Sequence, residues 1–251
     1  MDTELKTWER KYFTKPLDSS FLFYCVFGDF SADFKIPAMK YRTSGIPDGC
    51  DLRVLNTKKD SEYIQSLLEG YLWESSKKGD PDLANQISHS KECIVVKGEF
   101  KDTSDLNYLR DVIGIITYLF DNGGVGIYDP QGFRFMGKKA WTENIFSPDG
   151  SVPRNHVMIL YSEEHGKKWY HTRGLRKFGR PDLSIHEVTP QYEDAIYDLF
   201  NRFIEYEAFG GIIADKQEIK MNTLPSGMWC ENKGDPDDPD FNNKHVEIHW
   251  K

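Results

Sequence analysis

The chain has 251 residues, and its 40 acidic against 32 basic side chains give a formal net charge of -8 at pH 7. This acidic balance argues against general binding to nucleic acid or to an anionic membrane, since both require a basic surface. Hydrophobic residues at 39% and aromatic residues at 14% exclude a disordered chain and predict a folded core.

The four cysteines lie far apart, at Cys25, Cys50, Cys93 and Cys230. Because no two of them form a CxxC pair, we expect neither a structural zinc site nor a disulfide framework, and no other cofactor. The first residues are charged and lack the apolar segment of a signal peptide, and no apolar run is long enough to span a bilayer. The sequence therefore predicts a cytoplasmic protein that does not bind membranes.

The first ninety residues alternate short apolar segments with turn-rich ones. The run Phe21–Phe27 predicts a buried strand, and Asp51–Leu55 predicts a second one. Asp60 is a suitable N-cap for a helix that has apolar and aromatic residues on one face, namely Tyr63, Ile64, Leu67, Leu68 and Tyr71. Asp80 followed by Pro81 predicts the cap and first position of a short helix that ends near Ser88.

A strand–helix–strand unit follows. Cys93–Lys97 predicts a strand, and apolar residues at helical spacing predict a helix over residues 105–120. Gly123 supplies the conformational freedom that a helix C-terminus needs, and Val125–Tyr128 predicts the next strand.

The second half of the chain begins with three expected strands, at His156–Tyr161, Trp169–Arg173 and Leu183–Val188. Thr189 and Pro190 then open a predicted helix over 190–207, Gly210 and Gly211 end it, and Ile212–Ala214 predicts another strand.

The two halves share the order helix, GlyGly, apolar strand and Asp-x-Gln, with Asp129 and Gln131 in the first and Asp215 and Gln217 in the second. This parallel suggests an internal pseudo-repeat over 93–150 and 156–222, although chance could produce such a common connection. The predicted fold is α+β, with a mixed, mostly antiparallel sheet, helices packed on it, two duplicated strand–helix–strand halves as one option, and a single composite domain over 1–251. We interpret the Asp-x-Gln turns as structural strand ends rather than ligand sites.

The last part of the chain is an acidic loop over 224–240 followed by a strand. The loop includes GDPDDPD at 234–240, whose carboxylate density permits a weak cation site, but its prolines do not fit a calcium-binding EF-hand loop. A solvated loop is the preferred interpretation. In HVEIHW the side chains of His245, Glu247 and His249 share one strand face, on which His245 and His249 lie too far apart to chelate a metal by themselves.

The most unusual segment is the basic stretch, residues 167–184, which reads KKWYHTRGLRKFGRPDLS. It contains six cationic side chains in an otherwise acidic protein, Lys167, Lys168, Arg173, Arg176, Lys177 and Arg180, and His171 lies at its centre. Arginines suit bidentate contacts with carboxylate or phosphate. The candidate ligand-binding residues are therefore His171, Arg173, Arg176, Arg180 and Asp182, and the expected partner is an acidic protein or a small anionic ligand.

Two structural interpretations of the basic stretch remain open beside this one. In the first, the lysines are solvated and the arginines pair with the acidic loop at Asp235–Asp240. In the second, Arg173 and Arg180 are buried members of ion pairs that hold the stretch to the sheet.

A catalytic alternative is a hydrolase or transferase that acts on a phosphorylated or other anionic substrate. His171 would be its acid or base, since an unperturbed histidine titrates near neutral pH, and Arg173 and Arg180 would hold the anion. Asp182, His186 and Glu187 are possible partners of His171. The sequence contains neither a nucleophile elbow nor a phosphate-binding glycine-rich motif.

The segment HTRGLRKFGRPDLS at His171–Ser184, together with YDPQGFRF at 128–135 and DPDFNNKHVEIHW at 238–250, resembles a bacterial protein family of unknown function. The resemblance covers most of residues 90–251 and implies no particular activity. Small acidic cytoplasmic bacterial proteins of this kind are often immunity or accessory proteins that bind a partner. The resemblance therefore favours a non-enzymatic binding protein over an enzyme, by analogy.

Overall fold

The computed structural model describes residues 4–31 and 35–250, and the chain divides into two compact units. The first unit comprises Met1–Trp8, Phe21–Phe100 and Asp105–Val152, and the second comprises Glu9–Ser20, Lys101–Ser104 and Pro153–Lys251. Helices and mostly antiparallel strands confirm the predicted α+β class. The strands form two five-stranded sheets, however, and not the single sheet that we expected. A single composite domain over 1–251 stays a prediction.

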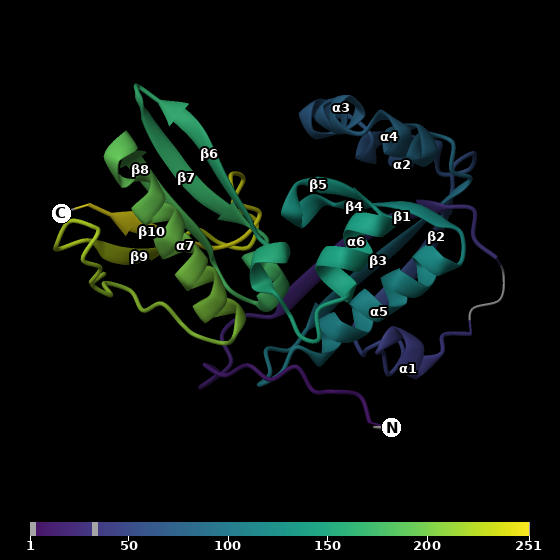
Figure 1. The fold of residues 1–251 in the computed structure, drawn as a ribbon, viewed down its shortest axis with the longest axis horizontal. Coiled ribbons are helices and arrows are strands. Elements are labelled where there is room, and N and C mark those ends of the chain that lie inside the picture. The colour runs from purple at the N-terminus through teal and green to yellow at the C-terminus, as the bar shows by residue number, and fades with distance from the viewer. Residues whose placement is uncertain (1–3, 32–34, 251) are drawn as a thin grey trace. The chain divides into compact units, whose positions relative to one another are not determined.

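The first sheet has the strand order β2-β3-β1-β4-β5. Its strands are β1 (Ser20–Gly28), β2 (Cys50–Asn56), β3 (Glu92–Phe100), β4 (Gly124–Asp129) and β5 (Arg134–Gly137), as Figure 1 shows. The pairs β1–β4, β2–β3 and β4–β5 are antiparallel. The four strands predicted in this part of the chain are confirmed.

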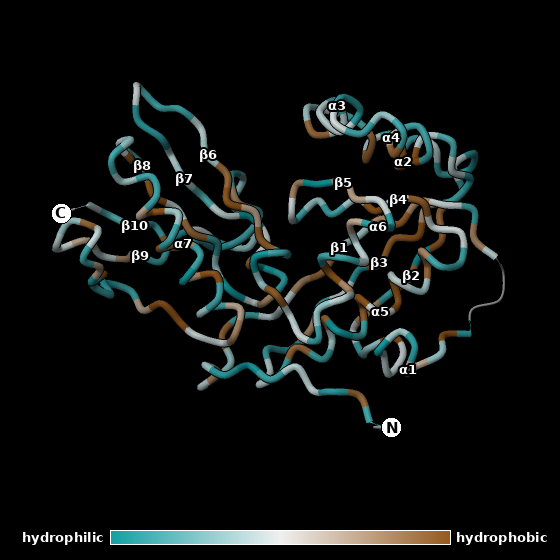
Figure 2. Tube along the Cα trace, in the orientation of Figure 1, coloured by the Kyte–Doolittle hydropathy of each residue, from teal (hydrophilic) through white to brown (hydrophobic). Residues whose placement is uncertain are grey.

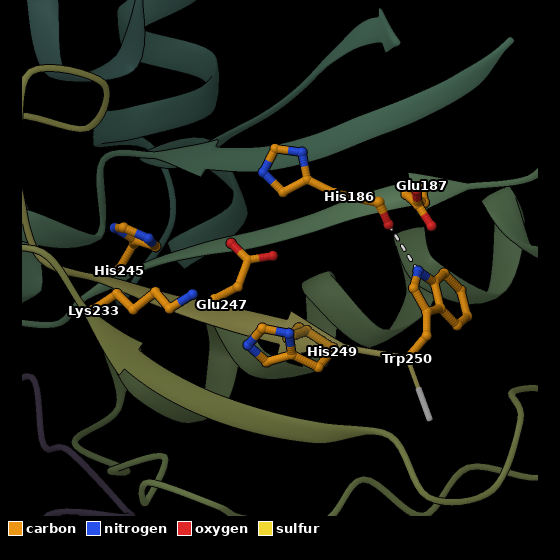
Figure 3. A pocket seen from close by; sticks show the side chains of 8 residues that line it. His186, Glu187, Lys233, His245, Glu247, His249 and Trp250 are labelled. Carbon is orange, nitrogen blue, oxygen red and sulfur yellow. Dashed lines mark hydrogen bonds between the residues drawn. The ribbon is translucent and has the colours of Figure 1, made fainter. Parts of the chain in front are cut away.

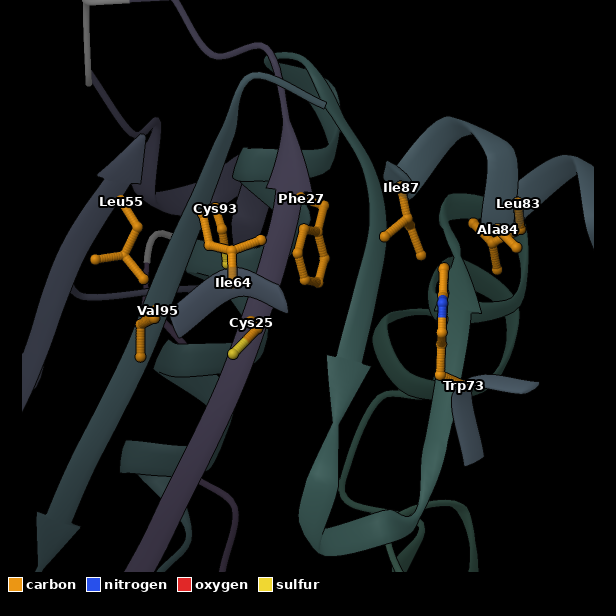
Figure 4. Close-up of a cluster of buried hydrophobic side chains, with 10 residues drawn as sticks. All are labelled: Cys25, Phe27, Leu55, Ile64, Trp73, Leu83, Ala84, Ile87, Cys93 and Val95. Atoms are coloured by element: carbon orange, nitrogen blue, oxygen red, sulfur yellow. The ribbon is translucent and has the colours of Figure 1, made fainter. Parts of the chain in front are cut away.

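The helices of the first unit are α1 (Ala38–Tyr41), α2 (Ser61–Leu67), α3 (Gly70–Gly79), α4 (Pro81–Ser88), α5 (Asn107–Asp121) and α6 (Lys138–Trp141). Side chains from α2, α3 and α4 form one buried cluster with strand residues, as Figure 4 shows: Cys25, Phe27, Leu55, Ile64, Trp73, Leu83, Ala84, Ile87, Cys93 and Val95. Successive side chains of a strand point to opposite faces, so Ile94 and Val96 of β3 point to the other face, where α5 lies (Figure 1). The central strands β1 and β3 are buried on both faces, which explains why their sequences are continuous apolar runs. Figure 2 shows these runs in brown.

The helix predicted after Asp60 is interrupted. Its residues form α2 and α3, and the chain turns at Gly70, whose φ of 79° lies in the left-handed region. Tyr71 is consequently not on the buried face and is 89% exposed. The Asp60 carboxylate accepts a hydrogen bond from the Asn56 amide instead of capping the helix. The predicted cap at Asp80 is confirmed, since its Oδ1 accepts a hydrogen bond from the Leu83 amide at 3.0 Å.

The second sheet has the strand order β6-β7-β8-β10-β9. Its strands are β6 (Met158–Glu164), β7 (Lys167–Arg173), β8 (Asp182–Val188), β9 (Trp229–Lys233) and β10 (His245–His249). The pairs β6–β7, β7–β8 and β9–β10 are antiparallel, and β8–β10 is parallel. Figure 2 shows that the tip of the β6–β7 hairpin is hydrophilic.

One long helix, α7 (Glu193–Ala208), packs on the second sheet (Figure 1). It buries Ile196, Leu199, Phe200 and Ile204. The strand side chains that face it are also buried, among them Leu183, Ile185, Val246, Ile248 and Cys230. Thr189 makes no side-chain cap, because a 3-10 turn over Pro190–Tyr192 separates it from the start of α7.

The predicted parallel between the two halves is incomplete. Residues 212–214, expected as a strand, are not in a strand, whereas β9 lies inside the segment expected to be a loop. In both Asp-x-Gln turns the glutamine side chain bonds to the main chain. Gln131 donates to the Phe21 carbonyl and accepts from the Phe23 amide, and Gln217 accepts from the Ala214 amide. The second half therefore has no counterpart of β4 at residues 212–214. Internal duplication stays a prediction.

Candidate functional site

The face of the second sheet that points away from α7 has a composition unlike that of the buried face. Strand register places on it Trp169, His171 and Arg173 of β7, His186 of β8, His245, Glu247 and His249 of β10, and Glu231 and Lys233 of β9. We call this set the polar face. The basic stretch contributes to it alternate residues of β7 and, by the same register, the buried Asp182 and Ser184 at the start of β8.

Aromatic and histidine rings stack across the polar face. Trp169 stacks on His186 with ring centroids 4.9 Å apart and on His171 at 4.3 Å. Phe241, from the loop before β10, stacks on His245 at 4.2 Å and meets the His171 ring edge-on at 6.0 Å. These contacts fix the rings in the folded state, because stacked aromatic pairs add stabilisation beyond their buried area.

His171, the candidate acid or base, is partly buried between Trp169 and Phe241. Burial, assisted by the Arg173 charge, lowers the pKa of His171 to about 4. Its buried Nδ1 makes no hydrogen bond with any residue in 4–31 or 35–250. No neighbouring side chain orients the ring for proton transfer in this structure, and the role of His171 as acid or base stays a prediction.

Arg180, a second candidate, lies in the interior of the second unit and is only 1% exposed. Its Nη1 donates to Asp102 Oδ2 at 2.8 Å, its Nε donates to the Gly211 carbonyl at 2.9 Å, and its Nη2 donates to the Gly210 carbonyl at 3.1 Å. Since its donors are satisfied by buried protein groups, Arg180 is a structural residue and does not belong to an accessible site.

Arg10 completes this buried group. It forms an ion pair with the other oxygen of Asp102 and donates to the carbonyls of Ala208 and Glu207 in the last turn of α7. Cationic groups at a helix C-terminus satisfy free carbonyls and favour the helix dipole. We call Arg10, Asp102 and Arg180 the arginine cluster.

Asp182, the last residue of the candidate set at the start of β8, is buried. Its carboxylate accepts hydrogen bonds from Thr172 Oγ1 at 2.9 Å, Asn243 Nδ2 at 2.8 Å and the Leu175 amide at 3.3 Å. Burial nevertheless raises the pKa of Asp182 to about 6, because desolvation outweighs these donors. Asp182 therefore links the basic stretch to the loop before β10 and is not accessible to a ligand.

The remaining cations of the basic stretch are also dispersed. Lys177 is fully buried and its Nζ donates to the His156 carbonyl at 3.1 Å. Lys167 pairs with Glu187 at 3.3 Å, and Lys168 pairs with Glu193 of α7 at 2.6 Å.

The two other arginines, Arg173 and Arg176, contact the segment before β10. Arg176 donates to the carbonyls of Pro236 and Asn242, and Arg173 lies over the Phe241 ring at 5.1 Å. The expected continuous basic surface is therefore absent from the described part of the stretch.

A pocket of about 560 Å³ opens on the polar face. We call it the histidine pocket. As Figure 3 shows, it is lined by His186, Glu187, Lys233, His245, Glu247, Ile248, His249 and Trp250. None of the five candidate residues predicted from the sequence lines it.

Two histidines of the pocket are held by carboxylates. His186 Nδ1 lies 2.9 Å from Glu164 Oε2, and His249 Nε2 lies 2.8 Å from Glu231 Oε2. His249 also stacks on Trp229 at 4.4 Å. His245 lacks such a bond, since its Nδ1 is 3.9 Å from Asp238, and burial lowers the pKa of His245. The rings are therefore oriented before any ligand binds.

Glu247 is the central acidic group of the pocket. In Figure 3 its carboxylate projects between His186 and His249. Register places it directly opposite Glu231 on β9, so that two carboxylates are cross-strand neighbours on one face. Glu231 pairs with Lys233 at 2.9 Å, whereas no ion pair joins Glu247 to another residue that the structure describes.

Sequence reasoning missed this pocket although part of its pattern was visible. The alternation of His245, Glu247 and His249 is visible in the sequence, but by itself it suggests only a possible metal site. His186 was considered only as a partner of His171. Lys233 lay in a segment expected to be a loop, so nothing in the sequence placed it beside β10.

No cluster of three or more His, Cys, Asp or Glu side chains suited to a metal ion occurs within 4–31 and 35–250. Among the described helices, none combines the length and the apolar character needed to cross a bilayer. Comparisons with protein-family models, with curated proteins and with solved structures gave no match.

Proposed function

We propose that this protein is a non-enzymatic binding protein and that its histidine pocket receives a cationic side chain, an ammonium or guanidinium group, of a protein partner. The observation that carries the proposal is the Glu247 carboxylate, which lines an open pocket without an ion-pair partner among the described residues. A guanidinium or ammonium group supplies the N–H donors that such a carboxylate accepts.

The charge of the pocket supports a cation over an anion. Glu187 and Glu247 outnumber the single ammonium group of Lys233 in its lining. The cross-strand carboxylates Glu247 and Glu231 repel each other, and a bound cation relieves that repulsion. Trp250 adds an aromatic ring in the same lining, which also suits a cation.

The acidic partner or small anion that we expected from the sequence has less support. That expectation required the cations of the basic stretch to act together, and the arginine cluster, Lys177 and the surface ion pairs separate them. Arg173 alone remains on the polar face, half-buried against Phe241.

The test is titration of the full chain with N-acetyl-arginine amide, followed by NMR or calorimetry. N-acetyl-citrulline amide has nearly the same shape without the charge and is the matched probe. We expect the arginine probe to bind more tightly, and Glu247→Gln to weaken it about tenfold, since a charge-assisted hydrogen bond is lost. Affinity is expected to fall as ionic strength rises.

The matched control is Glu163→Gln, which removes an exposed carboxylate from β6 outside the pocket. Equal binding of the two probes, or equal losses in Glu247→Gln and Glu163→Gln, would contradict the proposal. Glu247→Gln is also expected to leave the protein as stable as the wild type or slightly more so, because it removes a like-charge pair.

Acid–base catalysis is a second candidate function, and the carboxylate-bound His186 and His249 favour it. Both rings line one pocket, and an oriented histidine is the usual proton-transfer group. A generic phosphodiester such as bis-p-nitrophenyl phosphate is the probe. Turnover that disappears in both His186→Gln and His249→Gln, but persists in His171→Gln, would support catalysis at this pocket. Absence of turnover in the wild type would remove this support.

A further inference from the structure

We infer that the second unit contains another binding site, for an amphipathic monocarboxylate, in a second cavity of about 330 Å³ that shares Lys233 and His245 with the histidine pocket. Its walls are Leu17, Asp18, Pro181, Ile212, Ile213, Asn232, Lys233, Gly234, Lys244 and His245. We call it the apolar cavity. This inference goes beyond the proposed function and does not rest on it.

The walls of the apolar cavity combine hydrocarbon with ammonium groups. Leu17, Pro181, Ile212 and Ile213 supply apolar surface, which favours burial of an alkyl or aryl group. Lys233 and Lys244 supply two positive charges against the single carboxylate of Asp18. The lining therefore has a net positive charge even when His245 is not counted. The histidine pocket has the opposite balance.

The two lysines remain available to a ligand. Lys244 Nζ pairs with Asp18 at 2.7 Å, and Lys233 Nζ pairs with Glu231 at 2.9 Å. In both pairs each side chain is more than a third exposed, and such surface pairs contribute little stability. A ligand carboxylate can therefore share or replace these partners at small cost.

The arginine cluster builds the cavity in advance of binding. The Leu17 amide donates to Asp102 Oδ2 at 2.8 Å, Pro181 follows Arg180 in the chain, and Ile212 follows Gly211, whose carbonyl accepts from Arg180. Three of the four apolar walls are thus tied to one buried ion group. Preformed walls reduce the entropy cost of binding.

The segment Ile212–Ile213 offers hydrogen-bonding groups as well as apolar ones. It was expected to be a strand, but it pairs with no strand, and no hydrogen bond joins the amide of Ile212 or Ile213 to another described residue. An extended, unpaired segment beside two ammonium groups is consistent with a carboxylate site.

The probe is octanoate, titrated into the full chain and followed by calorimetry. Octanamide has the same tail without the charge, and acetate has the charge without the tail. We expect saturable binding of octanoate that is about tenfold tighter than that of either control compound. Saturable binding with similar affinity for octanoate and octanamide would overturn the inference, as would failure of octanoate to bind.

Two variants locate the site. Lys244→Gln and Leu17→Ser are each expected to weaken octanoate about tenfold, whereas Lys220→Gln, which changes an exposed lysine outside the cavity, is expected to have no effect. Equal losses in Lys244→Gln and Lys220→Gln would overturn the assignment. Glu247→Gln is expected to leave octanoate binding unchanged, so failure of the proposed function and failure of this inference are distinguishable. Thermal unfolding of each variant establishes that it is folded.

Discussion

The arginine cluster and the polar face use neighbouring residues of one basic stretch in opposite ways. Arg180 is buried and donates to Asp102, a carboxylate that it shares with Arg10, and to backbone carbonyls, while Trp169, His171 and Arg173 point to the face that carries the histidine pocket. A residue's type and its neighbours in sequence therefore do not determine whether it stabilises the fold or meets a ligand. What decides it is whether distant segments supply partners.

The largest expected effect separates two arginines of the same stretch. Arg180→Ala is expected to lower the free energy of unfolding by about 3–5 kcal/mol, since it removes one of the two guanidinium partners of the buried Asp102 carboxylate and leaves the carbonyls of Gly210 and Gly211 without their donor. Arg176→Ala, at an exposed position that bonds mainly to loop carbonyls, is expected to cost about 1 kcal/mol. Urea denaturation measures both. Similar losses in the two variants would erase the distinction between buried and exposed members of the stretch.

An intermediate effect concerns pH. The folded-state pKa of Asp182 is raised from 3.8 to about 6, so the folded protein binds this proton more tightly than the unfolded chain. Its contribution to stability is present below pH 4 and is lost as pH rises to about 6, which amounts to about 3 kcal/mol at most. Relative to wild type, Asp182→Asn should gain stability across this window. Denaturation curves at several pH values test it, and a pH-independent difference would contradict the assignment.

His171 on the polar face should show the opposite slope. Its folded-state pKa is lowered from 6.5 to about 4, so the unfolded chain binds the proton more tightly. The associated stability is present above pH 6.5 and is lost as pH falls towards 4. His171→Leu should therefore become relatively more stable than wild type on acidification, and the same denaturation series measures this difference. A gain on alkalinisation would show that the assigned shift has the wrong sign.

The smallest expected effect is at the exposed lysines. Lys167→Gln breaks only a surface pair with Glu187 and should change the free energy of unfolding by less than about 1 kcal/mol. It should not weaken binding of the arginine probe or of octanoate, because Lys167 lines neither site and its loss only releases the Glu187 carboxylate in the histidine pocket. A loss of binding in this variant would return attention to the basic surface that the sequence suggested.

Local pattern was sufficient to predict much of the fold. The apolar runs at Phe21–Phe27 and Cys93–Lys97 and the helical spacing over 105–120 reflect burial that the sequence itself encodes. Local pattern could not reveal β9, because Trp229–Lys233 lies among turn residues and becomes a strand by pairing with β10. Conversely, 212–214 is apolar but has no partner strand.

The site was less predictable than the fold for the same reason. The principal acidic partner of Arg180 is Asp102, which is 78 residues away in the chain, and nothing around either residue indicates the other. The histidine pocket combines β8, β9 and β10, and its lining becomes apparent only when the parallel β8–β10 pairing is known. A run of like charges therefore marked a segment correctly as unusual without indicating which of its side chains are accessible.

The parallel pairing of β8 with β10 also has a consequence for synthesis on the ribosome. Residues 189–244 must be made before β10 can enter the sheet between β8 and β9. Until then β8 presents an open edge, and β9 lacks its neighbour in the sheet. The second unit therefore completes its sheet only after β10 has been made, and a nascent chain paused before His245 exposes that edge to aggregation.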